Sequence, residues 1–233
     1  MTEYFKKNQA IFSPEEMALL ADKKILVAGC GGLGGSVIEL LSRSGIGHLI
    51  VADGDQFEPS NMNRQLLCTT DTLGRSKAEA AAGRILSINP DADVRTVCCR
   101  LDRNNLKELL PGCDLVIDAL DSVSGRLMLE DACAEEGLFL IHGAVNGWFL
   151  QAGVCPPGAG MLHTLYASHD PGGPSSGGIA MTVFTCAAFE VSEAIKLLLY
   201  RPDTLTGKLV FFDLLSKESE VVSLGVNGDP ASL

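Results

Sequence analysis

Glycine, acidic and basic residues that could handle phosphate fall at spaced positions in the first half of the chain. The stretch "GCGGLGGS" (29–36) follows the apolar run "KILVA" and has the G-x-G-x-x-G spacing. Glycine permits a tight turn and close approach of backbone amides to phosphate, and a following helix N-terminus adds partial positive charge. The spacing predicts a nucleotide-binding loop with candidate contacts at Gly29, Gly31, Gly32 and Gly34.

An acidic residue lies where a nucleotide loop of this kind needs one. Asp53 ends the next apolar run, "HLIVAD" (48–53), about 20 residues after the loop, where a carboxylate can bind ribose hydroxyls. Two alternatives stay open at this point. The loop could belong to a dinucleotide-binding oxidoreductase, or it could be a tight structural turn with an acid at a strand end.

Polar residues beyond Asp53 favour a triphosphate over a dinucleotide. The short segment "GDQFEPSNMNRQ" is followed by a predicted helix that opens near a lysine and by the strand "DLVIDAL" (114–120). Arginine clamps phosphate oxygens, lysine neutralises charge, and aspartate can hold Mg²⁺. We therefore expect a nucleoside triphosphate, with Asp121 as the candidate Mg²⁺ ligand and Arg64, Lys77 and Asp121 as candidate catalytic residues. The further candidate nucleotide contacts in these segments are Ser60, Asn61, Gln65 and Ser122.

The elements that must position these residues alternate between strand and helix. Strands are predicted over 24–29, 48–53, 93–99, 114–120 and 138–145, and helices over 34–44, 74–89, 104–110 and 124–136. This alternation predicts an α/β fold with a Rossmann-like, doubly wound, mostly parallel sheet. Ligands bind such sheets at the carboxyl ends of the strands, which is where Asp53 and Asp121 are expected.

The pattern changes in the last third of the chain. "FLQAGVC" (149–155), "PPGAG" and "MLHTLY" (161–166) predict an antiparallel hairpin across a Pro-Gly turn. We expect a loop over 166–178, a helix over 179–199, two antiparallel strands near 208–213 and 219–224, and a disordered tail over 225–233. With an N-terminal helical segment over 1–23, the chain is interpreted as one domain, 1–233.

Composition excludes several classes of protein. The net charge of −11 makes nucleic acid a poor partner. No apolar run approaches the roughly 20 residues that span a bilayer, and the N-terminus has no signal-peptide core, so we expect a cytoplasmic protein without membrane contact. The eight cysteines form no C-x-x-C pair, which favours reduced, buried thiols over disulfides or a metal site.

The combined run "GCGGLGGS…VADGDQFEPSNMNRQ…GRSKAE…DALDS" resembles the MoeB/ThiF/HesA family of adenylyltransferases, relatives of ubiquitin-activating enzymes, and the likeness extends over about residues 24–224. The resemblance implies an ATP- and Mg²⁺-dependent enzyme that adenylates the C-terminal Gly-Gly carboxylate of a ubiquitin-like sulfur-carrier protein. It also implies a homodimer. By position, it implies ATP contacts from Gly31, Asp53, 60–64, Lys77, Asp121 and Ser122.

The sequence departs from the family pattern at four places. The two C-x-x-C pairs that hold zinc in many members are absent, so no zinc is expected, and His163 is interpreted as structural. The crossover loop, 166–178, has no cysteine; Cys155 and Cys186 are interpreted as core thiols, which favours adenylation without a covalent adduct. Many members have Asn at the position of Ser122.

The fourth departure concerns the N-terminus, where family dimers often supply an arginine to the partner's ATP site. This chain has Lys6 and Lys7 there, which either replace that charge or form a solvated pair; lysine is not equivalent to arginine at a bidentate phosphate site. Two alternatives to the adenylyltransferase hypothesis remain. They are an NAD-binding oxidoreductase and a non-catalytic scaffold that binds nucleotide or a ubiquitin-like protein.

Overall fold

The computed structural model describes residues 3–168 and 177–224. Most of the predicted crossover loop, at 169–176, and the predicted tail, at 225–233, therefore lie outside the described residues. The chain begins with the 3₁₀ helix η1 (Glu3–Ala10) and helix α1 (Pro14–Asp22). Ser13 caps α1, because its Oγ accepts a hydrogen bond from Glu16 N–H while the Glu16 side chain accepts one from Ser13 N–H.

The described residues form an eight-stranded sheet with the order β3-β2-β1-β4-β5-β6-β7-β8. The first five strands are parallel: β1 (Lys24–Ala28), β2 (His48–Ala52), β3 (Asp93–Val97), β4 (Leu115–Asp118) and β5 (Leu140–Asn146). The last three extend the sheet in antiparallel fashion: β6 (Phe149–Cys155), β7 (Lys208–Asp213) and β8 (Ser219–Ser223). The predicted fold class is confirmed.

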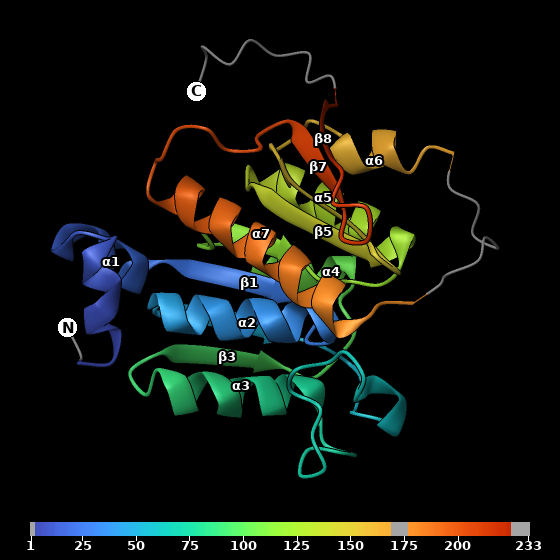
Figure 1. The fold of residues 1–233 in the computed structure, drawn as a ribbon. Coiled ribbons are helices and arrows are strands. Elements are labelled where there is room, and N and C mark those ends of the chain that lie inside the picture. The colour runs from blue at the N-terminus through green and yellow to red at the C-terminus, as the bar shows by residue number, and fades with distance from the viewer. Residues whose placement is uncertain (1–2, 169–176, 225–233) are drawn as a thin grey trace.

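Helices cover both faces of this sheet (Figure 1). Apolar residues of α2 (Gly32–Ser44), α3 (Lys77–Ile88) and α7 (Ala180–Leu198) pack in one core cluster with alternate residues of the strands. Residues of α4 (Arg103–Leu109), α5 (Val123–Glu136) and α6 (Met161–Leu165) form a second cluster on the other face. A second 3₁₀ helix, η2 (Pro59–Asn61), lies in the long connection between β2 and α3.

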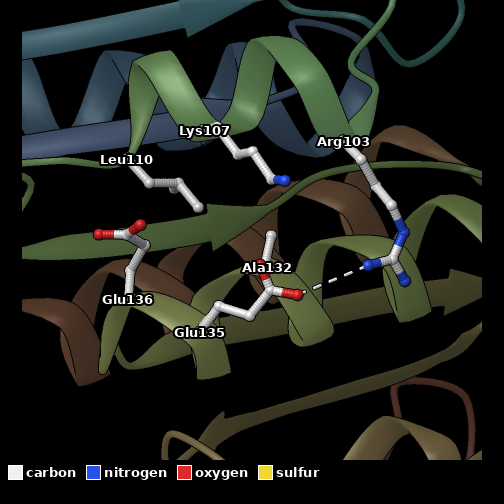
Figure 2. A pocket seen from close by; sticks show the side chains of 6 residues that line it. All are labelled: Arg103, Lys107, Leu110, Ala132, Glu135 and Glu136. Atoms are coloured by element: carbon white, nitrogen blue, oxygen red, sulfur yellow. Dashed lines mark ion pairs between the residues drawn. The ribbon is translucent and has the colours of Figure 1, made fainter.

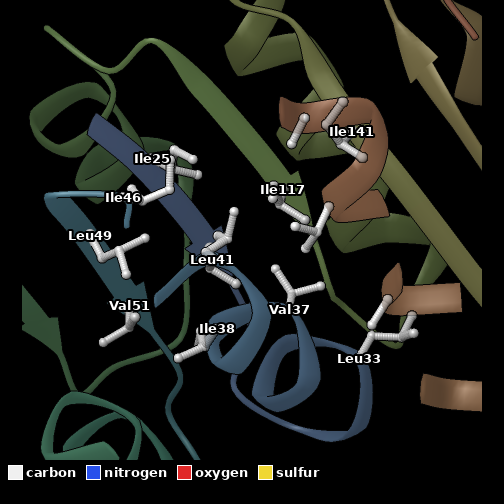
Figure 3. Packing of buried hydrophobic residues seen from close by; sticks show 14 of the residues in the cluster. Ile25, Leu33, Val37, Ile38, Leu41, Ile46, Leu49, Val51, Ile117 and Ile141 are labelled. Carbon is white, nitrogen blue, oxygen red and sulfur yellow. The ribbon is translucent and has the colours of Figure 1, made fainter. Parts of the chain in front are cut away.

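Helix α2 sits over the centre of the first core. Val37, Ile38 and Leu41 are fully buried and point toward Ile25, Leu49, Val51 and Ile117 of the strands (Figure 3). Burying each such side chain contributes about 1.5–3 kcal/mol of transfer free energy. This packing fixes the direction of α2, and hence the place of the glycine loop that precedes it.

The order of the strands creates a topological switch point at the carboxyl ends of β1 and β4. The chain runs outward from β1 through β2 to β3 and then returns to β4 on the other side of β1. The loops after β1 and β4 therefore diverge to opposite faces, which is the position where open α/β sheets bind ligands.

The predicted hairpin between "FLQAGVC" and "MLHTLY" is wrong. Strand β6 pairs with β5 and β7 instead, and Met161–Leu165 is the helix α6. The carboxylate of Glu130 on α5 accepts hydrogen bonds from Leu162 N–H at 2.9 Å and His163 N–H at 3.1 Å, which satisfies two amides of the first helical turn. The buried residues Met161 and Leu162 and the half-buried Leu165 have helical spacing, and the run is too short to separate helix from strand by pattern alone.

Among the described residues, none of the helices combines the length and apolarity required to cross a membrane.

Candidate nucleotide-binding site

The glycine loop between β1 and α2 needs glycine for two separate reasons. Gly29 has φ +102°, and a methyl group built on it would lie 2.6 Å from Ala119 O in the loop after β4. A methyl group on Gly34 would lie 1.8 Å from Gly29 O, inside the turn itself. Gly29 therefore permits a left-handed backbone conformation, and Gly34 permits α2 to pack directly against the turn.

Asp53 braces this loop from the end of β2. Its Oδ2 accepts a hydrogen bond from Cys30 N–H at 2.8 Å, and its Oδ1 accepts one from Asp55 N–H, also at 2.8 Å. The structure thus brings the predicted acid to the glycine loop, half-buried, at the carboxyl edge of the sheet. Its predicted contact with a ribose stays a prediction.

The segment around η2 lies over the glycine loop. A methyl group on Gly32 would be 3.7 Å from Arg64 O. The Arg64 guanidinium is half-buried and donates to Ser60 O at 3.2 Å and to Asn63 Oδ1 at 2.9 Å. Asn61 is buried and its Oδ1 accepts from Glu58 N–H, so its side chain shapes the turn. Ser60 is exposed.

Gln65 carries a buried polar atom that the described residues leave unpaired. Its side chain is 7% exposed, and Oε1 has no hydrogen-bond partner among them. Gln65 Nε2 lies 3.5 Å from the position of a methyl group on Gly31, so the amide stands next to the glycine loop. Because an unpaired buried carbonyl oxygen carries a desolvation penalty of about 1–3 kcal/mol, a donor supplied by a ligand would be favourable here.

Lys77 opens helix α3 and is buried, with 7% exposure. Its Nζ lies 3.3 Å from Asp55 Oδ2. Burial raises the pKa of the Cys30 thiol well above its ordinary value, and the positive charge of Lys77 acts in the opposite direction. Asp55 N–H donates to Asp53, which in turn accepts from Cys30 N–H of the glycine loop, so the lysine paired with Asp55 lies near that loop.

Asp121 and Ser122 follow β4. Ser122 is the N-cap of α5, and its Oγ accepts from Gly125 N–H at 3.3 Å. Asp121 is exposed, and its carboxylate accepts no hydrogen bond from the described residues. Within them no hydrogen bond or ion pair joins Asp121 to Arg64 or to Lys77. Arg64 and Asp121 lie in loops and Lys77 is the first residue of α3, all toward the same edge of the sheet.

The described residues contain no preassembled cluster of metal ligands. In residues 3–168 and 177–224, no group of three or more His, Cys, Asp and Glu side chains could hold a metal ion. His163, expected on a strand, lies on α6, where its Nε2 is 2.8 Å from Asp131 Oδ1. The predicted absence of zinc stays a prediction.

Sequence reasoning missed a polar network buried beneath the Asp121 loop. Its members come from β4, α5, β5, β6 and the end of α6, and they are Asp118, Arg126, His142, Gln151 and Tyr166. The signal available in the sequence was a set of charged or polar residues inside otherwise apolar runs, as in "DLVIDAL" and "LFLIHGAV".

A surface depression between α4 and α5 is separate from this site (Figure 2). Arg103 ion-pairs there with Glu135 at 3.6 Å and with Asp131 at 2.7 Å. The charges that line the depression are thus partly paired with one another. None of its lining residues belongs to a glycine loop that could receive phosphate. The residues that line it are Arg103, Lys107, Leu110, Ala132, Glu135 and Glu136.

A doubly wound sheet with a glycine loop, a bracing acid and cationic side chains at its carboxyl edge defines a nucleotide-binding protein of the Rossmann-like class. The chain belongs to the ThiF family, whose model matches residues 5–229.

Known proteins that are similar to this chain differ from it in length. The chain is 35% identical to the SAMP-activating enzyme E1 of Haloferax volcanii, over 93% of this chain and 82% of that protein. It is 31% identical to the molybdopterin-synthase adenylyltransferase of Salmonella typhimurium, over 88% and 84%. It is 34% identical to the sulfur carrier protein ThiS adenylyltransferase of Bacillus subtilis, over 81% of this chain but only 58% of the relative.

Solved structures show the same fold at low sequence identity. Escherichia coli MccB superposes with a TM-score of 0.81 at 19% identity, covering 97% of this chain and 72% of that one. PaaA superposes with a TM-score of 0.75 at 23% identity, covering 90% and 66%. MccB has also been solved with ATP, in a structure that matches at a TM-score of 0.75 and 22% identity over 92% of this chain and 66% of MccB.

Proposed function

We propose that this protein is an ATP-dependent adenylyltransferase that activates the C-terminal Gly-Gly carboxylate of a ubiquitin-like sulfur-carrier protein. Membership of the ThiF family and the names of relatives at 31–35% identity support this class of reaction. The observation that carries the proposal is the loop pair at the β1/β4 switch point. Gly29 and Gly34 allow no side chain there, and the buried Gln65 Oε1 beside Gly31 lacks a partner among the described residues.

The chemistry asks for cations and alignment more than for proton transfer. A C-terminal carboxylate is already ionised at neutral pH, so it can attack the α-phosphate without a general base. The new bond joins the carboxylate oxygen to the α-phosphorus, the bond from that phosphorus to the bridging oxygen breaks, and pyrophosphate leaves with the electron pair. We assign Arg64 and Lys77 to the phosphates and Asp53 to the ribose, since charge neutralisation and positioning dominate such transfers.

The residues at the site fit Mg²⁺ bound together with nucleotide. Mg²⁺ commonly takes one or two protein carboxylates and completes its shell with phosphate oxygens and water. Asp121 supplies one exposed carboxylate that the described residues leave unbonded, and the lack of a three-residue cluster in that part of the chain is compatible with this mode. When bound, Mg²⁺ would neutralise charge on the phosphates.

A homodimer is part of the proposal. Met181 and Phe184 expose 55% and 42% of their surface on the outer side of α7, and Met62 is 46% exposed in the segment above the glycine loop. Val183, which is near Met181 and Phe184 on α7, and Arg64, which is near Met62 in sequence, both lie against Gly32. The two exposed apolar areas therefore lie close to the same point of the glycine loop. Exposed apolar side chains grouped in this way are typical of subunit interfaces.

Lys6 and Lys7 could serve only a partner's site in such a dimer. Asn8 Nδ2 donates to Arg43 O, so η1 packs against the C-terminal end of α2, whereas the glycine loop precedes the helix. With 13 residues, α2 spans about 20 Å. The proposed setting is the cytoplasm, where ATP is available and thiols stay reduced; all eight cysteines are free.

Pyrophosphate exchange into ATP tests the reaction, using several carriers that end in Gly-Gly. Asp121→Asn removes the proposed metal-binding charge and keeps the side-chain shape, so carrier-dependent exchange should fall by about 10²–10³. Asp131→Asn is the matched control, because Asp131 is a half-buried aspartate on α5 that pairs with Arg103 and His163 and has no part in the proposed site. Wild-type exchange in a folded Asp121→Asn variant would remove Asp121 from the mechanism. NAD binding or carrier binding without exchange would instead favour the oxidoreductase or the scaffold.

A further inference from the structure

Both backbone polar groups of Leu120, the residue immediately before Asp121, are held by side chains. Leu120 N–H donates to Asp118 Oδ1 at 3.0 Å. Leu120 O accepts from Arg126 Nε at 3.1 Å and from the second guanidinium nitrogen, Nη2, at 2.8 Å. That carbonyl belongs to the planar peptide bond that ends at Asp121 N, so fixing it fixes the plane from which the Asp121 side chain departs.

The two side chains that hold Leu120 are themselves buried and oriented. Asp118 is fully buried at the end of β4, and the Arg126 side chain is 11% exposed on the first turn of α5. Arg126 Nε lies 3.7 Å from Asp118 Oδ2, which also accepts a hydrogen bond from His142 Nδ1 at 2.8 Å. The two side chains that hold Leu120, here called the Leu120 clamp, are therefore a fixed arginine and a fixed carboxylate, Arg126 and Asp118, and not two mobile surface side chains.

Three further side chains, from Tyr166, Gln151 and His142, complete the network around the Leu120 clamp. Arg126 Nη1 donates to Tyr166 Oη at 2.6 Å, and Gln151 Nε2 donates to the same oxygen at 3.0 Å. His142 Nε2 lies 3.0 Å from Gln151 Nε2 and 3.3 Å from Tyr166 Oη, so either group can donate to it. Burial lowers the pKa of His142, which favours the neutral ring that can donate at Nδ1 and accept at Nε2.

Packing alone does not call for such a network. A buried ion pair is weak evidence for stability, because apolar residues of similar volume often stabilise a core equally well or better. A rigid, fully bonded cluster does give orientation, since each member has its rotamer fixed by the next. The group that this cluster orients is the Leu120 peptide, and the chain leaves it directly into Asp121.

We propose that Arg126 and Tyr166 are positioning residues for Asp121, which hold the peptide before it so that its carboxylate faces the metal of bound Mg·ATP. Arg126 acts on the Leu120 carbonyl, and Tyr166 fixes the Arg126 guanidinium. The inference rests on the proposed function, because it takes Asp121 as the Mg²⁺ ligand.

Calorimetric titration of the full chain with ATP, once with Mg²⁺ and once with EDTA, tests this without relying on turnover. The measured quantity is the ratio of the two affinities, here called the Mg²⁺ gain. Misplacing the carboxylate should reduce the Mg²⁺ gain about 10-fold in Arg126→Lys and about 3-fold in Tyr166→Phe. Affinity for ATP in EDTA should stay at the wild-type value in both variants, because the glycine loop and Lys77 are untouched.

Controls separate this inference from the proposed function and from a general loss of structure. Arg103→Lys makes the same substitution on α4, where the guanidinium pairs with Asp131 and Glu135 and does not touch Leu120, so it should keep the full Mg²⁺ gain. Asp121→Asn should abolish the gain. A gain retained by Asp121→Asn would overturn the proposed role of Asp121 and this inference with it. A gain lost in Asp121→Asn but retained in folded Arg126→Lys and Tyr166→Phe would overturn the positioning role alone.

Tyr166→Phe keeps the test decisive if Arg126→Lys does not fold, because it removes one hydroxyl and leaves the charges in place. If a variant loses as much ATP affinity in EDTA as it does in the presence of Mg²⁺, the substituted residue has a purely structural role. That result would also overturn the inference. In pyrophosphate exchange, the same two variants should need more Mg²⁺ for half-maximal rate, and Arg103→Lys should not.

Discussion

The ammonium group of Lys77 lies 3.3 Å from a carboxylate oxygen of Asp55, and the lysine is buried whereas the aspartate is half exposed. Arg100 approaches the same aspartate at 3.7 Å from the end of β3. In the protein without nucleotide, the lysine assigned to the phosphates therefore already has a counter-ion. A triphosphate that binds Lys77 must compete with Asp55 or draw the lysine away from it.

Asp55→Asn is accordingly expected to strengthen ATP binding. Removing one negative charge beside a polyanion is worth about 1 kcal/mol at this distance near water, or roughly 5-fold in affinity. Calorimetry at low and high salt measures the effect, which should shrink as salt screens it. Asp93→Asn is the control. Asp93 pairs with His48 at the opposite edge of the sheet, so its substitution should leave the affinity for ATP unchanged. Weaker ATP binding in Asp55→Asn would mean that Asp55 aligns Lys77 instead of competing for it.

Two glycines in helices should respond in opposite directions to alanine. Gly34→Ala places a methyl group 1.8 Å from Gly29 O, a backbone atom that cannot move without opening the loop. We expect a loss of more than 3 kcal/mol of unfolding free energy, or failure to fold. Gly83 lies in α3 with nothing within 4 Å of its added methyl group, so Gly83→Ala should stabilise the protein by about 0.5–1 kcal/mol.

Urea denaturation of both variants measures this contrast, and ATP titration of any folded Gly34→Ala protein reports on the loop itself. A Gly34→Ala protein with wild-type stability would show that the close approach of α2 to the turn is not required for this fold.

The parallel half of the fold could be predicted from sequence because its signals are local and repeated. Each strand is a short apolar run, and the β1–α2 turn carries glycines where the backbone needs them. The antiparallel part was harder. Met161–Leu165 is a helix because Glu130, 31 positions earlier than Met161, binds its first amides. No local pattern in "MLHTLY" reports a partner so distant in sequence.

Residues of the candidate site that lie in local motifs could be predicted, whereas those with partners distant in sequence could not. The glycines, Asp53, Lys77 and Asp121 belong to recognisable motifs, and the structure places them at the predicted sheet edge. Arg126, His142 and Tyr166 become neighbours only when α5 and α6 pack over β5 on one face of the sheet. The side chain of Asn61 accepts a hydrogen bond from Glu58 N–H, and that of Ser122 accepts one from Gly125 N–H. Their residue types therefore have a structural cause apart from any nucleotide contact.

Cys186 is expected to take no covalent part in the reaction. It is fully buried on α7, where its Sγ lies 3.4 Å from Gln151 O. Burial raises the pKa of this thiol well above its ordinary value, so little of the reactive thiolate forms. Incubation with ATP and carrier should give no adduct that a reducing agent releases, and Cys186→Ala should keep pyrophosphate exchange. Iodoacetamide should label the exposed Cys98 and Cys99 first, as read by mass spectrometry.

A thiol-sensitive enzyme–carrier adduct that disappears in Cys186→Ala would contradict this expectation. An adduct that persists in that variant would direct attention to Cys98 and Cys99 instead.

Glu190 should make the stability of the protein depend on pH. Its side chain is fully buried on α7 against Gly143 of β5, and neither carboxyl oxygen has a hydrogen-bond partner among the described residues. Burial raises the pKa of this carboxyl well above 4.5, so the folded protein keeps a proton that the unfolded chain releases above about pH 4.5. The folded state then binds more protons, and its unfolding free energy falls as pH rises, until the pH passes the folded-state pKa.

Glu190→Gln removes this titration while keeping the shape of the side chain. Relative to the wild type, the variant should therefore gain unfolding free energy as pH rises from about 5 to 8, by up to about 1.4 kcal/mol per pH unit. Urea denaturation at a series of pH values measures the difference. Glu193→Gln on the same helix is the control: Glu193 accepts from Leu205 N–H at 2.7 Å and pairs with Lys196, so its substitution should destabilise the protein across the range. If the difference between Glu190→Gln and wild type stays constant with pH, Glu190 is not the proton-holding group that its burial indicates.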